Sequence, residues 1–124
     1  MKWLILIGGE NFNLDVIRRI KHEGCIECYD VNHIKGRYCV NYGQDHVFYD
    51  YQQNLDDFED DLVKVPYSAP NFITMIYTST QRARSILQLK SFPHDIYVDN
   101  DDGLVLPIDE FIRLGMPLAE RQSQ

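Results

Sequence analysis

Residues 3–7 (Trp-Leu-Ile-Leu-Ile) run directly into Gly8 and Gly9, and this stretch indicates where the centre of the fold lies. Five consecutive apolar residues closed by glycines are typical of a strand that is covered on both faces. A membrane span takes about 20 apolar residues, and the apolar part of a secretion signal takes about 7–15. We therefore expect a central buried strand in a cytoplasmic protein without a membrane partner.

The segment after this strand predicts a helix and a second strand. Asn13 can cap a helix that Gly24 ends. Residues 25–31 then have the composition of a strand. A strand, a helix and a strand in this order predict a parallel pair joined by a right-handed crossover.

The rest of the chain predicts short antiparallel strands with two further helices and a closing helix. The strand signals lie at residues 37–42, 46–51, 72–77, 96–98 and 104–106, and the helix signals at 54–64, 80–89 and 107–115. The order βα-βββ-α-βα-ββ-α predicts an α/β (α+β) fold with a mixed sheet of six to seven strands and three to four helices. We expect one domain over residues 1–118 and a frayed polar tail over 119–124.

Charge is segregated along the chain. Its 124 residues include 19 Asp and Glu and 12 Lys and Arg, which gives a formal net charge of -7. Seven acids and no Lys or Arg lie between Arg37 and Lys64, and six acids and no Lys or Arg lie between Ser91 and Ile112. This balance argues against a nucleic-acid partner, because neutralising phosphates needs a clustered basic surface.

Tyrosines accompany the first acidic stretch. Alternation over residues 46–51 predicts two strand faces, one with Val47, Tyr49 and Tyr51 and the other with His46, Phe48 and Asp50. Tyrosine is enriched at binding hot spots, and carboxylates around it steer a basic partner. The same pattern also fits half-buried sheet tyrosines beside a solvated acidic face, so both interpretations stay open at this point.

The functional interpretation is a non-enzymatic acidic protein that sequesters a basic protein partner by occlusion, as a monomer or homodimer. In physical type such a protein resembles the bacterial immunity proteins, which block basic nuclease toxins by covering their active-site clefts. The resemblance implies a toxin inhibitor. The residues expected to contact the partner are Asp45, Tyr49, Asp50, Tyr51, Asp56, Asp57, Glu59, Asp60 and Asp61.

An alternative function is the binding of a small molecule, phosphate or nucleotide. Gly8-Gly9 and Thr78-Ser79-Thr80 both follow strands, where α/β folds bind phosphates at helix N-termini, and Arg82 could pair with an anion. Neither stretch completes a phosphate-binding motif. Plain capping of a helix by Thr78 or Ser79 is the commoner explanation of the second stretch.

Metal and redox chemistry are not expected. His22, Cys25, Cys28 and His33 are zinc-ligand types, but in a strand over residues 25–31 the two cysteines would point to opposite faces. A redox C-x-x-C pair should open a helix, whereas this one follows a helix. We expect reduced structural thiols, no cofactor and no metal.

Two weaker patterns complete the sequence. Asp99, Asp101 and Glu110 have the spacing of calcium-loop positions 1, 3 and 12, but Leu104 replaces the glycine that such a loop needs. A hairpin turn over residues 100–103 accounts for these acids. The histidines are scattered and no nucleophile has an adjacent base, so the sequence nominates no catalytic residue.

Overall fold

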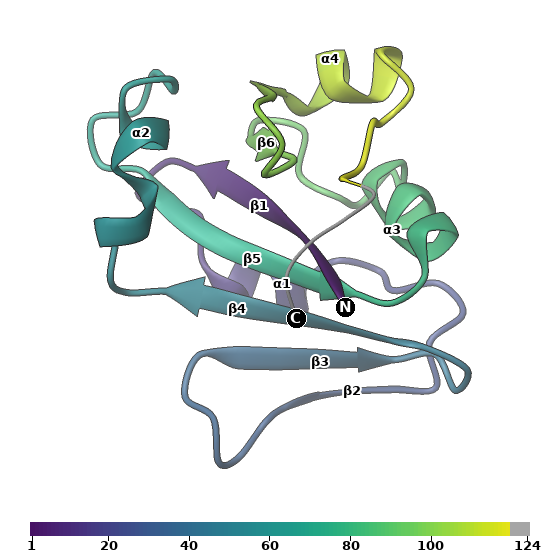
Figure 1. The fold of residues 1–124 in the computed structure, drawn as a ribbon. Coiled ribbons are helices and arrows are strands. Elements are labelled where there is room, and N and C mark those ends of the chain that lie inside the picture. Colours follow the sequence, from purple (N-terminus) through teal and green to yellow (C-terminus); the bar gives the residue numbers. More distant parts are fainter. Residues whose placement is uncertain (120–124) are drawn as a thin grey trace.

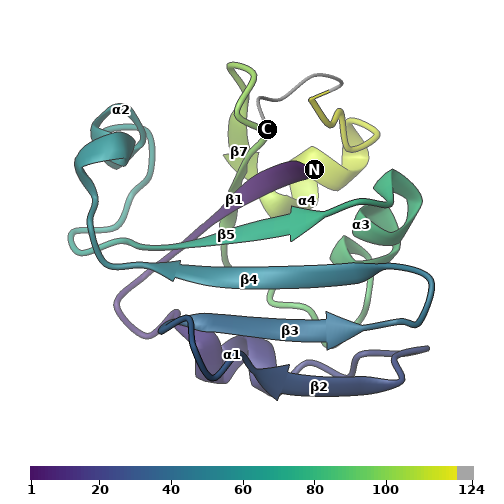
Figure 2. The same cartoon turned by 60° about the horizontal axis from the view of Figure 1, so that its bottom comes forward.

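β1 (Lys2–Gly8) lies inside the sheet, as its apolar sequence predicts. In the computed structural model, which describes residues 1–119, β1 pairs with β5 (Asn71–Tyr77) on one side and with β6 (Tyr97–Asp99) on the other. The seven strands have the order β2-β3-β4-β5-β1-β6-β7 (Figure 1 labels β1 to β6, and Figure 2 labels β7). The other four strands are β2 (Glu27–Asp30), β3 (Arg37–Asn41), β4 (His46–Gln52) and β7 (Val105–Pro107).

Helices pack on both faces of this sheet (Figure 2). One face is covered by α1 (Leu14–Arg18), α3 (Thr80–Leu87) and α4 (Ile108–Arg113), whose buried residues belong to the larger core. The other face carries the 3-10 turn η1 (Asp56–Phe58) and the single-turn helix α2 (Glu59–Leu62). The side chains of Asn13 and Ser79 cap α1 and α3 by accepting hydrogen bonds from backbone N–H groups.

Alternation along β1 separates two cores. Leu4 and Leu6 point into the larger core under α1, α3 and α4. Ile5 and Ile7 point to the opposite face, where Phe58 of η1 covers them. Two buried faces explain why the strand is apolar without interruption.

The face that carries α2 is only partly covered. In β4, Val47 and Tyr49 are fully buried in the larger core, which confirms the expected alternation. On the opposite face of β4, His46 is exposed and Phe48 is half-buried. The sheet therefore has an open face over β3 and β4, beside the part that η1 and α2 cover.

The α/β (α+β) class, the seven strands, the four helices and their order are confirmed. The predicted parallel crossover is wrong, because β1 pairs antiparallel with β5 and β6, and β2 lies at the sheet edge against β3. Every strand pairing within residues 1–119 is antiparallel, so the sheet is not mixed. The two most apolar strands bury each other side by side, and the polar β2 takes the edge.

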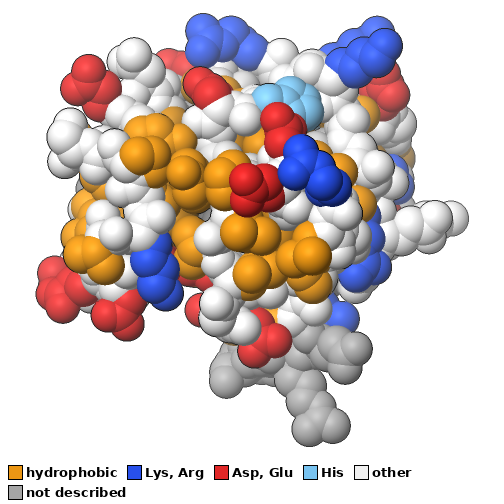
Figure 3. Space-filling view, turned by 90° about the horizontal axis from the view of Figure 1, so that it is seen from above, with side chains coloured by type: hydrophobic (Ala, Val, Ile, Leu, Met, Phe, Trp, Pro, Cys, Tyr) orange, Lys and Arg blue, Asp and Glu red, His pale blue; other side chains and the backbone are white. Residues whose placement is uncertain are grey.

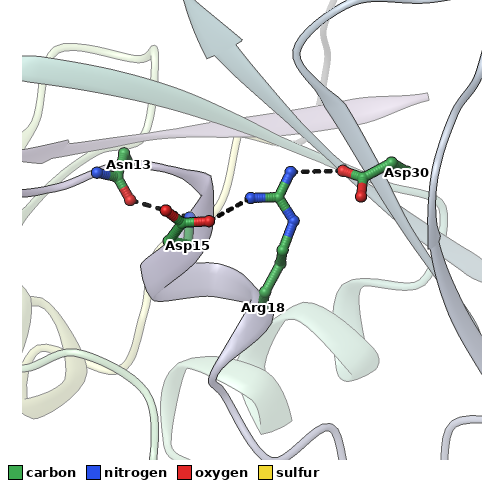
Figure 4. A network of polar contacts seen from close by, with 4 residues as sticks. All are labelled: Asn13, Asp15, Arg18 and Asp30. Carbon is green, nitrogen blue, oxygen red and sulfur yellow. Dashed lines mark hydrogen bonds and ion pairs between the residues drawn. The ribbon is translucent and has the colours of Figure 1, made fainter.

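Local boundaries differ in three places. The helix expected over residues 54–64 is divided into η1 and α2, and the second strand begins at Glu27 rather than Cys25. The expected hairpin turn is confirmed, with Asp101 at φ 57° and Gly103 at φ 91°. The connection between α1 and β2 is tied by Arg18, which pairs with Asp15 and Asp30 (Figure 4).

The expected tail over residues 119–124 lies outside the described residues except for Ala119, which is buried. Within residues 1–119, no helix combines the length and the apolar character that crossing a membrane requires.

Candidate functional site

A groove of about 410 Å³ opens on the partly covered face of the sheet, beside η1. Its floor is made by β1 and β5, where Trp3 faces Ile76 and Ile5 faces Thr74 in the strand register. We call it the acidic groove, and its lining residues are Met1, Trp3, Ile5, Asp57, Phe58, Thr74, Ile76 and Asp101.

The charged side chains that line the acidic groove are both carboxylates. Asp57 comes from η1 and Asp101 from the β6–β7 turn, and both are exposed. No Lys or Arg is found among the described residues that line it. The indole N–H of Trp3 donates a hydrogen bond of 2.8 Å to Oδ2 of Asp101, which holds that carboxylate at the wall.

A row of apolar side chains runs from the acidic groove across the open face. Ile76 lies opposite Phe48 of β4, Phe48 opposite Cys39 of β3, and Cys39 opposite Tyr29 of β2. Ile76 and Phe48 are half-buried and Tyr29 is 42% exposed. A single row of side chains therefore joins the groove to the edge strand.

Seen from above, where α2 and α4 lie, the surface carries hydrophobic side chains with acidic and basic side chains among them (Figure 3). The acidic groove combines a concave apolar floor with two carboxylate side chains at its walls.

Asp61 of α2 and Asp99 of β6 bring the two acidic stretches together close to the groove. Both side chains are buried, with 7% and 6% of the residue surface exposed. Burial, followed by a hydrogen bond to the carboxyl of Asp99, raises the pKa of Asp61 from 3.8 to about 7. Below about pH 7 the Asp61 carboxyl is therefore mostly protonated, which removes one negative charge from this buried position.

The expected contact residues on β4 and in the turn before it do not form an acidic surface. Asp50 makes two hydrogen bonds of 2.7 Å to Arg37, and Asp45 is bonded to Arg82 at 3.1 and 3.3 Å. Tyr49 is fully buried, so its place in the expected contact set is corrected. The register of β3 places Arg37 opposite Asp50, and α3 places Arg82 beside Asp45.

The expected contact residues around α2 are more exposed. Asp56, Asp57, Glu59 and Asp60 all lie on the surface. Within residues 1–119, none of these four carboxylates makes an ion pair. Asp61 is the buried member of the group, and Tyr51 is half-buried and donates a hydrogen bond to Asn71.

Several residues of the groove were not among the expected contacts. The sequence predicts Trp3 and Ile76 as core residues, because both lie in apolar strands. Periodicity does not show which part of a sheet face remains uncovered by helices. Asp101 belongs to the second acidic stretch, none of whose residues was among the expected contacts. Its position in the groove beside η1 depends on the sheet order.

One of the two expected phosphate positions, Thr78-Ser79-Thr80 with Arg82, is occupied by contacts within the chain itself. Ser79 Oγ accepts the backbone N–H of Arg82 at 3.0 Å, as an ordinary cap does. The guanidinium of Arg82 lies 3.9 Å from the centre of the Tyr42 ring and pairs with Asp45. The turn at Gly9 borders a cavity of about 500 Å³, whose lining includes Arg19 together with the acids Glu10 and Asp95.

Metal-ligand clusters are not found within residues 1–119. In the β6–β7 turn, Asp99 Oδ1 accepts the backbone N–H of Asp101, and Asn100 Oδ1 accepts those of Asp102 and Leu104. These oxygens stabilise a hairpin turn.

Comparisons with protein-family models, with curated proteins and with solved structures find no match for this chain.

Proposed function

We propose that this chain is a non-enzymatic acidic binding protein that sequesters a basic protein by covering part of its surface, as a toxin inhibitor of the immunity type does. The observation that supports the proposal most directly is the acidic groove, a concave apolar surface with Asp57 and Asp101 at its walls.

The groove suits one kind of contact in particular. Its volume of about 410 Å³ falls within the range of about 300–1,000 Å³ that is usual for pockets that hold an inserted group. An apolar side chain of the partner would lie on Trp3 and Ile76, and flanking Lys or Arg side chains would meet Asp57 and Asp101. Apolar anchors surrounded by charged groups are a common arrangement at protein interfaces.

The exposed acids beside the groove add to its field. Asp56, Glu59 and Asp60 have no ion-pair partner within residues 1–119. Carboxylates of this kind accelerate encounter with a positively charged partner, and salt weakens the effect. Asp45 and Asp50 contribute little to this field, because their own arginines neutralise them.

The test is a titration of the chain with a basic protein domain, for which a domain encoded beside this chain is the first candidate. We expect Asp57→Asn combined with Asp101→Asn to weaken binding at least about tenfold, because two charge contacts are lost. Raising the salt concentration from about 50 to about 300 mM should weaken binding by the parent more than by the double variant.

Glu23→Gln is the matched control, since it removes one exposed carboxylate outside the groove. It should leave affinity nearly unchanged. Equal affinity of the parent and the double variant, or a salt response as large in the double variant as in the parent, would contradict the proposal.

A second candidate function is the binding of a small molecule or phosphate at the Gly9 turn, and the cavity of about 500 Å³ is the observation that favours it. Glu10 and Asp95 in its lining oppose an anion. A nucleotide at 100 times its dissociation constant would stabilise the fold by about 2.7 kcal/mol. Thermal unfolding against a panel of nucleotides and phosphates tests this candidate, and an unchanged melting temperature would exclude it.

A further inference from the structure

The thiols of Cys25 and Cys28 are neighbours in the folded chain. Their Sγ atoms lie 3.7 Å apart. Cys25 precedes β2 and Cys28 lies within it, so the opposite-face geometry of a continuous strand does not apply. Gly24 has φ 83°, and the N–H of Cys25 donates to the carbonyl of His22 at 3.3 Å. This turn brings both sulfur atoms to the same side.

The separation of the two sulfur atoms is small compared with what a disulfide requires. A disulfide bond measures about 2.05 Å, so the two atoms must approach each other by less than about 2 Å. Both cysteines are half-buried and pack against the larger core. They are accessible enough for a small reagent and constrained enough to stay together.

The segment that carries the pair is held at its C-terminal end and in its middle. Arg18 of α1 pairs with Asp30 at the end of β2 at 2.5 Å and with Asp15 at 2.6 Å (Figure 4). The N–H of Ile26, between the two cysteines, donates to the carbonyl of Asn41 at 2.7 Å. These two contacts limit the freedom of the thiols to move apart.

The two thiols differ in their surroundings. Burial, together with a hydrogen bond to Cys25, raises the pKa of Cys28. The Cys28 thiol therefore keeps its proton and donates to the sulfur of Cys25. The sulfur of Cys25 accepts that bond, which suits it to be the nucleophile.

We propose that Cys25 and Cys28 form a reversible dithiol–disulfide site whose oxidant is a hydroperoxide. The Cys25 thiolate attacks the peroxide, so the O–O bond breaks, hydroxide or an alkoxide leaves and takes up a proton from solvent to become water or an alcohol, and Cys25 becomes a sulfenic acid. The Cys28 sulfur then forms the S–S bond and displaces the hydroxyl, which leaves as water with the thiol proton. Two thiols lose two electrons, the peroxide gains them, and a dithiol reductant reverses the change.

Cys39 provides an internal reference. It is fully buried in β3, and its register partners Tyr29 and Phe48 lie on the open face, opposite the side where Cys28 packs. Oxidation of the native chain should therefore spare it. Cleavage after Lys and Arg separates it from the pair, because Cys25 and Cys28 share the peptide 22–35 and Cys39 lies in 38–64.

The experiment treats the folded full chain with hydrogen peroxide, alkylates the remaining thiols in denaturant and weighs the peptides. We expect peptide 22–35 to lose about 2 Da and to resist alkylation, with both changes reversed by dithiothreitol. Peptide 38–64 should remain alkylated. The Cys39→Ser variant should behave like the parent, and Cys25→Ser should not form the bond within peptide 22–35.

The rate of disulfide formation in the unfolded chain is the control for the short sequence separation of the two cysteines. A faster rate in the folded chain would show that the fold holds the two thiols together. In equal peroxide, the native chain should form the bond at least about tenfold faster than the chain in urea, since the fold holds the two sulfur atoms together. Equal rates in the two states would overturn the proposal. Oxidation to sulfinic acid without a bond, or a bond that includes Cys39, would also overturn it.

Discussion

β4 and α2 carry acids of the same stretch of sequence, but the fold treats them in opposite ways. Asp45, which ends the turn before β4, and Asp50 within it are bonded to Arg82 and Arg37. Asp57 of η1 stays exposed, and Asp61 of α2 is buried against another carboxyl group. A run of acids in the sequence therefore does not by itself form an acidic surface, because the exposure and pairing of each carboxylate depend on the element packed beside it.

Asp61→Asn should have the largest effect on stability. The folded pKa of Asp61 is about 7, whereas its ordinary value is 3.8. Between these pH values the folded state binds more protons than the unfolded state, so this group's contribution to stability is full below about pH 4 and is lost as the pH rises through 7. Asparagine carries no charge, so at pH 8 the variant should be more stable by on the order of 2–4 kcal/mol.

The measurement is urea unfolding of parent and variant at pH 4 and pH 8, and the gain should be present only at the higher pH. Asp60→Asn is the matched control, since its side chain is exposed one residue away. A loss of stability in Asp61→Asn at pH 8 would show that Asp61 is stabilised as an anion, and the contrast with β4 would disappear.

Asp50→Asn should have the opposite sign and a smaller size. The variant removes a charge-assisted pair of hydrogen bonds to Arg37, whose side chain is 25% exposed. We expect a loss of about 1–2 kcal/mol. A double-mutant cycle with Arg37→Gln measures the coupling energy between the two side chains directly. A coupling energy near zero would show that Asp50 contributes as little to stability as the acids without an ion-pair partner.

Asp57→Asn and Asp101→Asn should change stability least, by less than about 0.5 kcal/mol each, because exposed groups without ion-pair partners contribute little. Asparagine tolerates the positive φ of Asp101 and keeps an oxygen for the Trp3 indole N–H. Thermal unfolding checks this. A large loss in either variant would mean that the groove walls hold the fold together.

Local patterns predicted much of this protein. The apolar runs located β1 and β5, alternation assigned Val47 and Tyr49 to one face, and the Asn-Asp-Asp-Gly sequence placed the turn at residues 100–103. The C-x-x-C pair was visible in the sequence, but its geometry was misjudged because β2 begins two residues later than expected. Neither the acidic groove nor the Asp61–Asp99 pair had a local signal.

The sequence by itself determined the apolar strands, the caps, the turn and the separation of charge, because these depend on residues within a few positions of one another. Only the tertiary structure decided which acids are neutralised. Arg37 and Asp50 are 13 residues apart, Arg82 and Asp45 are 37 apart, and Trp3 and Asp101 are 98 apart. Such contacts follow from strand register and sheet order, which arise when distant apolar strands bury one another.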